Sequence, residues 1–313
     1  MEAFLKEAFW VSFLFATIRM STPLLLASLG EIVSERSGVF NIGLEGMMLM
    51  GAFCGFLGLS LTDSLFIGIL AGMAGGLFLA FISAYLGVTL GVDQIVSGIA
   101  LNIFTVGFTS SFYRIIFGLT PPQVESSRMV PLGIPWLKDL PFFGPIFFNQ
   151  VPLVYVAFAL VPLLWFILFR TTIGLQVRSL GEHPLAADIA GIKVARLRYL
   201  SVLLAGLFAG LGGAYLSLGP LNLFSDNMVA GRGFIALAVV IFGRLNPFGA
   251  LGAALLFGAT EALQLRLQVI GLDIPYQFLL MLPYVATVVA LVGLIGKTRL
   301  PAALGVPYNE FNR

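Results

Sequence analysis

Charged residues are scarce in this sequence. Asp, Glu, Lys and Arg make up 10% of its 313 residues, whereas a soluble globular domain contains about 25%. Hydrophobic residues make up 59%, and the mean hydropathy is +1.01. A surface that faces water on all sides needs more charge than this chain supplies. The composition therefore excludes a soluble domain and predicts a protein that crosses a membrane several times.

Residues with reactive or metal-binding side chains are also few. Cys54 is the only cysteine and His183 the only histidine. This excludes a disulfide framework and leaves metal sites and a Ser-His-Asp triad poorly supplied. Gly296-Lys297-Thr298 ends like a phosphate-binding loop, but the first glycine of that motif would stand at position 291, which is Leu291. We therefore expect no catalytic residue, no metal and no cofactor in this chain, and we do not expect an enzyme.

The basic residues are unevenly distributed along the chain. Residues 170–198 hold five of the 17 Lys and Arg, whereas residues 140–169 and 199–225 carry no charge. A basic segment between two apolar spans is typical of a cytoplasmic loop, because positively charged loops stay on that side of the membrane. Topology thus accounts for the basic residues. The formal net charge of +2 gives no reason to expect a nucleic-acid partner.

A short helix is predicted inside this loop. Pro184 suits the first position of a helix, and Gly191 stands where a C-terminal cap belongs. Leu185, Ile189 and Ile192 are spaced as one apolar stripe. Two helical turns are not stable alone in water. We therefore expect this helix to dock into a groove of a soluble partner.

The same segment resembles the coupling loop of ABC-transporter permeases, in the variant of the branched-chain amino acid, simple sugar and nucleoside permease superfamily. The residues that carry the resemblance are Gly181, Glu182, His183, Pro184, Ala186, Ala187, Ala190 and Gly191. The resemblance implies that they dock onto an ATP-binding subunit, with the histidine at the start of the helix. The alternative is an ordinary basic loop.

The apolar spans predict the fold class. We expect an all-α, polytopic membrane bundle of about 8–10 transmembrane helices, some of them short or broken. Together they would form a single transmembrane permease domain over residues 1–313. About nine spans are expected, at residues 8–29, 39–61, 64–92, 95–118, 151–169, 199–218, 228–242, 248–265 and 275–295.

The connections between the spans differ in composition. Residues 119–150 are rich in proline and aromatic residues, which indicates an ordered extracytoplasmic loop. Residues 30–38 are expected to form a polar turn. If the loop at 170–198 is cytoplasmic, residues 30–38 and 87–94 are cytoplasmic too, and the N-terminus is outside, although one early lysine favours the opposite side. Basic residues after the last span predict a cytoplasmic C-terminus.

Glycine is abundant, with 36 residues. Three pairs are spaced four apart inside apolar spans, at Gly51 and Gly55, Gly72 and Gly76, and Gly206 and Gly210. This spacing lets helix backbones approach closely in lipid. It favours tight packing within the chain; contact with a second chain is the alternative.

A second stretch carries polar residues into an apolar span. Asn41 and Glu45 are four residues apart and are expected to share a helix face. A carboxylate is costly in hydrocarbon, so it must face the protein interior or water. One interpretation places both residues on a central substrate pathway or its gate, with Asn102 as a further pathway residue. The other is structural, with Glu45 bound by Arg19, Arg36 or backbone amides; we expect Arg19 as its partner.

The run from Gly38 to Met48 resembles the second-span signature of the same superfamily, in the spelling of its nucleoside-type branch. With Thr22 to Leu26 and the loop motif, the resemblance covers most of the chain. It implies the shorter permease subunit of a nucleoside ABC importer, a multi-pass protein of the cell (inner or plasma) membrane in contact with lipid. Implied partners are an ATP-binding subunit that holds the ATP, a second permease (a homologous heterodimer is favoured over a homodimer) and an extracytoplasmic substrate-binding protein.

Other functions remain open at this point. The same superfamily includes simple-sugar and branched-chain amino acid permeases. An ion-coupled secondary transporter would use Glu45, with Glu261 as a weaker candidate, but it does not need the loop at 170–198. An intramembrane enzyme acting on lipid requires a cluster of titratable groups at one depth, which the sequence does not assemble.

Overall fold

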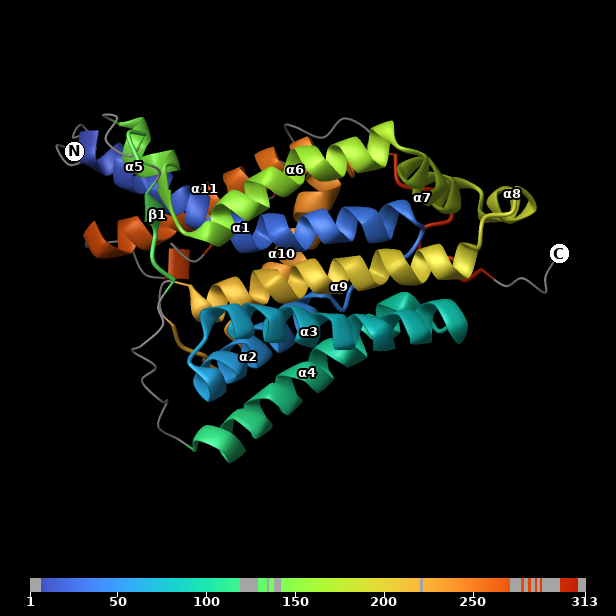
Figure 1. Cartoon of the computed structure of the whole chain (residues 1–313), viewed down its shortest axis with the longest axis horizontal. Helices are drawn as coiled ribbons and strands as arrows, with labels where there is room; N and C mark the ends of the chain where they lie inside the picture. The colour runs from blue at the N-terminus through green and yellow to red at the C-terminus, as the bar shows by residue number, and fades with distance from the viewer. Residues whose placement is uncertain are drawn as a thin grey trace.

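A computed structural model describes residues 7–118, 129–133, 135–137, 142–219, 222–270, 277–278, 281–282, 285, 288 and 299–308. These residues form a bundle of helices with one short two-stranded ribbon (Figure 1). Among them, seven helices are long and apolar enough to cross a membrane, which confirms the predicted fold class. The elements are α1 (Glu7–Arg36), α2 (Leu44–Thr62), α3 (Leu65–Ala84), η2 (Tyr85–Thr89), α4 (Gln94–Phe117), β1 (Leu132–Gly133), α5 (Phe143–Phe147), β2 (Asn149–Gln150), α6 (Pro152–Arg170), α7 (Thr172–Glu182), α8 (Pro184–Ile189), α9 (Val194–Leu218), α10 (Arg232–Phe242) and α11 (Pro247–Ile270).

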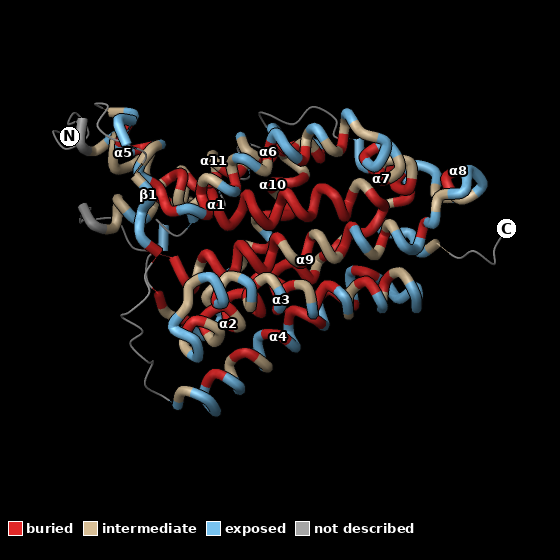
Figure 2. Tube along the Cα trace, in the orientation of Figure 1, coloured by how far each residue is buried: buried red, intermediate tan, exposed pale blue. Residues whose placement is uncertain are grey.

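The first helix is longer than its apolar run. We expected a polar turn at 30–38, but α1 continues to Arg36, so this prediction was wrong. Glu31 and Glu35 lie in this extension and are fully buried. The polarity that suggests a turn therefore belongs to a helix end that neighbouring elements cover. Figure 2 shows buried residues along the second half of α1 and much of α9.

The glycine pairs bring α2, α3 and α9 into close contact. A β-carbon on Gly51 would lie 2.5 Å from the Cα of Gly210, and one on Gly76 would lie 2.2 Å from the carbonyl oxygen of Gly206. Any side chain at these positions would push the helices apart. This confirms the prediction that the pairs serve packing within the chain.

The bundle has two distinct ends, which we call the α8 end and the α5 end. Helices α7 and α8 project from one end, and α5 and β1 lie at the other (Figure 1). At the α5 end, β1 pairs antiparallel with β2, Leu132 opposite Gln150. The described part of the expected loop 119–150 thus lies opposite the basic loop 170–198, as two loops on different sides of a membrane should.

Helix α10 is a half-helix. Its eleven residues span too little length to cross a bilayer, which takes about 20. We expected the span to begin at Met228, but Ala230 and Gly231 have positive φ angles of 50° and 87°, so the helix begins at Arg232. The expected break after this span is confirmed, because residues 243–246 separate α10 from α11.

The chain returns to the α8 end after α11. The last expected span, 275–295, falls outside the described residues apart from a few positions. Residues 299–308 are described again, and we call them the C-terminal arm. The arm packs against the ends of α1 and α7, on the same end as α8.

Candidate coupling surface and buried polar centre

Helix α7 was not predicted, because the loop 170–198 was expected to contain only one short helix. Thr171 begins it: the Thr171 hydroxyl accepts a hydrogen bond from the amide of Gly174 at 3.3 Å, which is a standard N-terminal cap. Val177 and Leu180 are buried on its inner face. The threonine cap and this three-residue spacing are the sequence signals that could have revealed α7.

Helix α8 lies where the sequence predicted it, from Pro184 to Ile189. Gly191 follows with φ of 83°, as expected of a glycine that ends a helix. The predicted apolar stripe is only partly correct, since Ile192 packs inward beside the buried Ala187. Leu185 and Ile189 instead face out, 47% and 80% exposed. A six-residue helix thus offers apolar side chains to its surroundings.

The C-terminal arm ties α7 to the end of α1. The amide of Ala303 donates to the carbonyl of Gly181 at 2.8 Å, and the amide of Gly305 donates to the carbonyl of Gly38 at 3.0 Å. Gly181 itself sits so close to α1 that a β-carbon would lie 2.4 Å from the carbonyl oxygen of Arg36. The connection between α7 and α8 is therefore held against the bundle through backbone atoms.

Arg198 completes this attachment. It is 1% exposed, and its guanidinium donates to the carbonyl of Val306 at 3.0 Å and to that of Ser37 at 3.3 Å. Arginine suits this position because its planar fork can bind two carbonyls at once. One side chain of α9 thus joins the arm to the end of α1.

An open cavity of about 430 Å³ separates α8 from the arm. On one side it is lined by residues 183–186, and on the other by Val306, Pro307 and Tyr308. The Tyr308 hydroxyl donates to a carboxylate oxygen of Asp188 at 3.0 Å. We call the exposed face of α8 with residues 306–308 of the arm the coupling surface.

Glu45 lies at the other polar location, inside the bundle. Its two carboxylate oxygens accept hydrogen bonds from the amides of Gly231 at 2.8 Å and Gly233 at 2.6 Å. These amides open α10, and a carboxylate is favourable there because the helix dipole is positive at that end. A β-carbon on Gly233 would lie 2.5 Å from the Cα of Glu45, so the contact requires glycine.

The expected pairing of Glu45 with Arg19 was wrong. The described residues contain two ion pairs, Arg114 with Asp226 and Arg232 with Glu261. Arg19 instead lies over the ring of Phe15, 5.4 Å from its centre. Backbone amides, the other partner considered for Glu45, satisfy its charge because the start of α10 presents unpaired N–H groups.

The structure brings Asn41 and Asn102 to the same place as Glu45, around the first turn of α2. Asn41 precedes the helix, which begins at Leu44, so the expectation that Asn41 and Glu45 share a helix face was wrong. The backbone amide of Asn41 donates to the Glu31 carboxylate at 3.0 Å. Asn102 accepts from the amide of Gly46 at 2.8 Å and donates to the carbonyl of Ile42 at 3.0 Å. All three side chains are buried.

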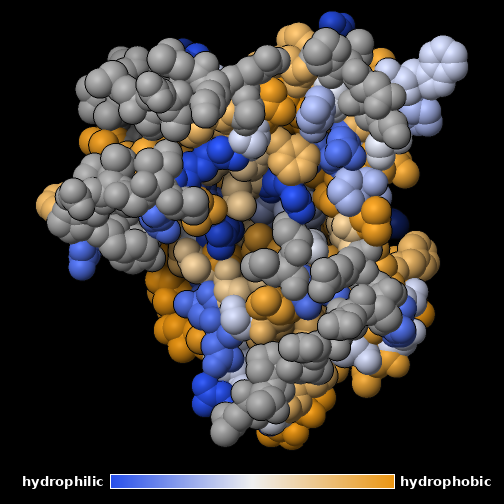
Figure 3. All heavy atoms as spheres, turned by 90° about the vertical axis from the view of Figure 1, so that its left-hand side faces the viewer, coloured by the Kyte–Doolittle hydropathy of each residue, from blue (hydrophilic) through white to orange (hydrophobic). Residues whose placement is uncertain are grey.

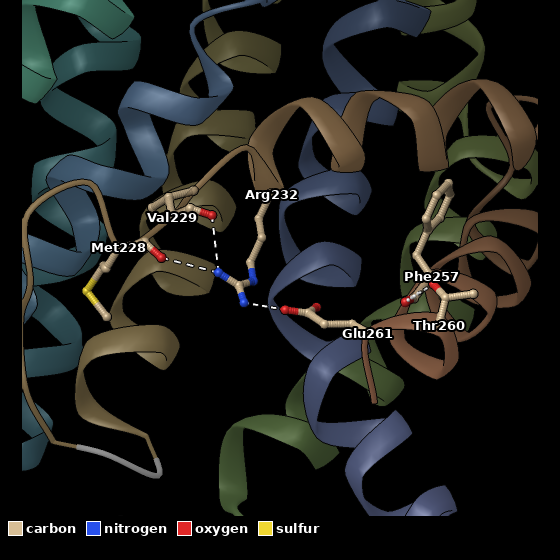
Figure 4. A network of polar contacts seen from close by, with 6 residues as sticks. All are labelled: Met228, Val229, Arg232, Phe257, Thr260 and Glu261. Atoms are coloured by element: carbon tan, nitrogen blue, oxygen red, sulfur yellow. Dashed lines mark hydrogen bonds and ion pairs between the residues drawn. The ribbon is translucent and has the colours of Figure 1, made fainter. Parts of the chain in front are cut away.

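A second acidic group meets α10 from α11. Figure 4 shows Arg232 reaching from the start of α10 toward Glu261, with which it forms an ion pair. Arg232 also donates to the carbonyls of Met228 and Val229, both at 3.2 Å. From the sequence we expected Glu261 only as a weaker ion-binding candidate, and the ion pair with Arg232 was not predicted. An acidic and a basic residue in neighbouring apolar segments could have indicated it, because charged groups inside a membrane usually pair with each other.

Figure 3 views the α5 end face on, where hydrophilic residues gather around a hollow near the middle and hydrophobic residues lie at the rim. Among the described residues, no three His, Cys, Asp or Glu lie close enough together to hold a metal ion.

The described residues include seven helices of membrane length, and the half-helix α10 packs against α1, α2 and α11. They make up a polytopic membrane protein. The chain belongs to the family described as branched-chain amino acid transport system / permease component, whose model matches residues 13–298. This makes it a multi-pass protein of the plasma membrane, one component of an ABC transport system, and not an enzyme. The resemblance found in the sequence is confirmed.

Three relatives are similar over most of their length. The guanosine ABC transporter permease protein NupQ of Bacillus subtilis is 43% identical, with 95% of this chain and 96% of the relative covered. The putative glucose ABC transporter permease protein TsgC13 of Haloferax volcanii is 40% identical over 85% and 80%. The nucleoside ABC transporter permease protein NupC of Lactococcus lactis is 38% identical over 92% and 93%. No solved structure matches the chain significantly.

Proposed function

We propose that this chain is the permease subunit of an ATP-driven importer of nucleosides or related small polar solutes. The single observation that carries the proposal is the coupling surface. It exposes apolar side chains of α8, and α7, the arm and Arg198 hold it against the bundle. The similarity to a guanosine permease over 95% of the chain supports the solute class. Residues 1–313 act as one permease domain, with loop 170–198 in the cytoplasm and loop 119–150 outside.

The coupling surface docks onto an ATP-binding subunit, which holds the ATP. Leu185 and Ile189 enter a groove of that subunit, because exposed apolar side chains gain most from burial. Ala187 is small enough to let α8 lie on the protein. The complete motif of Gly181, Glu182, His183, Pro184, Ala186, Ala187, Ala190 and Gly191 sets the shape and attachment of the helix.

The permease acts in a larger assembly. A second permease completes the transmembrane part, a homologous heterodimer being favoured and a homodimer the alternative. A binding protein outside the cell delivers the solute. ATP-driven closure of the ATP-binding subunits moves α8, and the arm and α7 carry this motion to the ends of α1 and α9.

Asn41, Glu45 and Asn102 belong to the gate region of the substrate pathway. Glu45 holds the start of α10 through two backbone amides, and Asn102 holds the start of α2 through the backbone of Ile42 and Gly46. The Asn41 side chain contacts the sulfur of Met47 in α2. The ion-coupled alternative requires Glu45 to bind an ion. Both of its oxygens are occupied by the amides of α10, which favours the ATP-driven mechanism.

Uptake by the complete importer in proteoliposomes tests the proposal. We expect ATP-dependent nucleoside uptake in vesicles whose ion gradients have been collapsed. Glucose is the second candidate solute, because one relative is named a putative glucose permease; uptake of glucose but not nucleosides would replace the solute class. Uptake that follows an ion gradient without ATP would overturn the proposal.

A further inference from the structure

A second cavity, of about 330 Å³, opens at the α8 end. It lies where the end of α1, the start of α4, the end of α10 and the C-terminal arm meet. Glu35, Phe40 and Gln94 line it together with apolar walls from Ile241, Leu300 and Leu304. A mostly apolar cavity with a few convergent polar groups is typical of a small-molecule site.

The polar groups of this cavity lack partners in the described protein. Glu35 is fully buried, and neither of its carboxylate oxygens has a hydrogen-bond partner among the described residues. Gln94 is 6% exposed. Its side-chain oxygen accepts from the amide of Phe40 at 2.8 Å, while its Nε2 has no partner. Buried polar groups are rarely left unpaired, so this arrangement calls for a ligand.

The neighbouring charges are committed elsewhere. Arg36, next to Glu35, donates to the carbonyl of Leu245 at 3.0 Å. Glu31, one turn earlier, accepts from the backbone amide of Asn41 through one oxygen, and it does not line the cavity. Asp93 also lines the cavity, but it accepts from amides in the first turn of α4. The cavity therefore presents two free acceptor atoms, from Glu35, and one free donor, from Gln94.

This pattern matches one edge of a nucleobase. A single free carboxylate among apolar walls offers too few oxygens to hold a metal cation. A planar base with two N–H groups and a carbonyl on one edge, as in guanine, could donate to both oxygens of Glu35 and accept from Gln94. The ring of Phe40 adds an aromatic wall suited to a flat heterocycle.

We propose that this cavity is an inward-facing site that binds the base of a transported nucleoside, with Glu35 and Gln94 reading its amide edge. The inference rests on the proposed function and locates a substrate site within it. A base that lacks the N–H groups leaves the carboxylate unpaired, and a site built to pair them rejects such a base. The site therefore favours guanosine over adenosine.

The test uses the complete importer in proteoliposomes, with ATP inside and guanosine or adenosine as substrate. Glu35→Gln should raise the guanosine KM by about tenfold or more and reduce the preference over adenosine, because hydrogen bonds to a charged group are strong. Asp93→Asn is the matched control. It changes an acid on the same wall, and it should keep the wild-type KM and preference.

A second variant covers the case in which Glu35→Gln does not assemble. Gln94→Glu keeps the oxygen that accepts from Phe40 but replaces the free donor with an acceptor, which repels the carbonyl of the base. It should also lower the preference for guanosine, measured on the complex that assembles.

The outcomes separate the two proposals. A wild-type importer that takes up no nucleoside overturns the proposed function, and the base site with it. If the wild type transports nucleosides and an assembled variant at position 35 or 94 keeps the wild-type preference, the base site alone is wrong. Equal losses in Asp93→Asn also overturn it.

Discussion

The coupling surface and the start of α10 differ in where they place apolar and charged side chains. On α8, apolar side chains such as Ile189 are exposed. At α10, the charged groups of Glu45, Arg232 and Glu261 are held inside an apolar bundle. The buried charges find their partners within the chain, whereas the exposed apolar groups do not. The comparison indicates that the α10 region works by internal positioning, and that the α8 region needs another subunit.

The largest effect is expected at the contact between α8 and the rest of the protein. Ala187→Glu forces a charged side chain into a position that is 4% exposed, so α8 should leave its place and transport should be lost. The chain should still insert into the membrane, because no span is touched. Ala195→Glu, at an exposed alanine of α9, is the control for an added charge in the same loop. Uptake and membrane content are the measurements, and normal uptake by Ala187→Glu would argue against the coupling role.

The next effect concerns the outer face of the same helix. Ile189→Asp leaves the fold intact, since its side chain is 80% exposed, but it removes apolar surface from the proposed interface. Burial of an isoleucine side chain contributes about 1.5–3 kcal/mol to the free energy of binding. Its loss should therefore lower the affinity for the ATP-binding subunit by about 10–100-fold. Titration in detergent measures this. Leu61→Asp, 72% exposed at the end of α2, should bind as the wild type does; equal losses in both variants would contradict the prediction.

The two ion pairs differ in how far they are exposed. Arg232 and Glu261 are 24% and 19% exposed, whereas Arg114 and Asp226 are 62% and 43% exposed. Glu261→Gln should lower the free energy of unfolding by about 2–3 kcal/mol, because it leaves a largely buried arginine without its partner. Asp226→Asn should change it by less than about 1 kcal/mol. Thermal unfolding in detergent distinguishes the two, and equal shifts would show that burial does not decide the difference.

Glu45→Gln is expected to have a smaller effect than Glu261→Gln. Glutamine keeps an oxygen for the amides of α10 but loses the charge, so stability should fall by about 1 kcal/mol. We expect reduced uptake rather than none. Glu45→Ala removes both hydrogen bonds and should do more on both counts. Wild-type uptake and melting temperature in Glu45→Gln would make the carboxylate incidental.

The predictable features are those that depend on short stretches of sequence. The spans, the position of α8 and the packing glycines follow from hydropathy, one proline and a four-residue spacing. The features that could not be predicted depend on contacts between distant residues. The extension of α1 is buried by other elements, and the start of α10 is defined by Glu45, far away in sequence. Arg198 and the arm likewise meet only in the folded chain.

The C-terminal arm has a thermodynamic consequence. Its residues 300, 304 and 305 line the cavity beside Glu35, while residues 306–308 border α8. Ten residues thus touch two proposed binding sites at once. If a solute in the cavity shifts the arm, it changes the affinity of the ATP-binding subunit by some factor. Reciprocity then requires that subunit to change the affinity for the solute by the same factor.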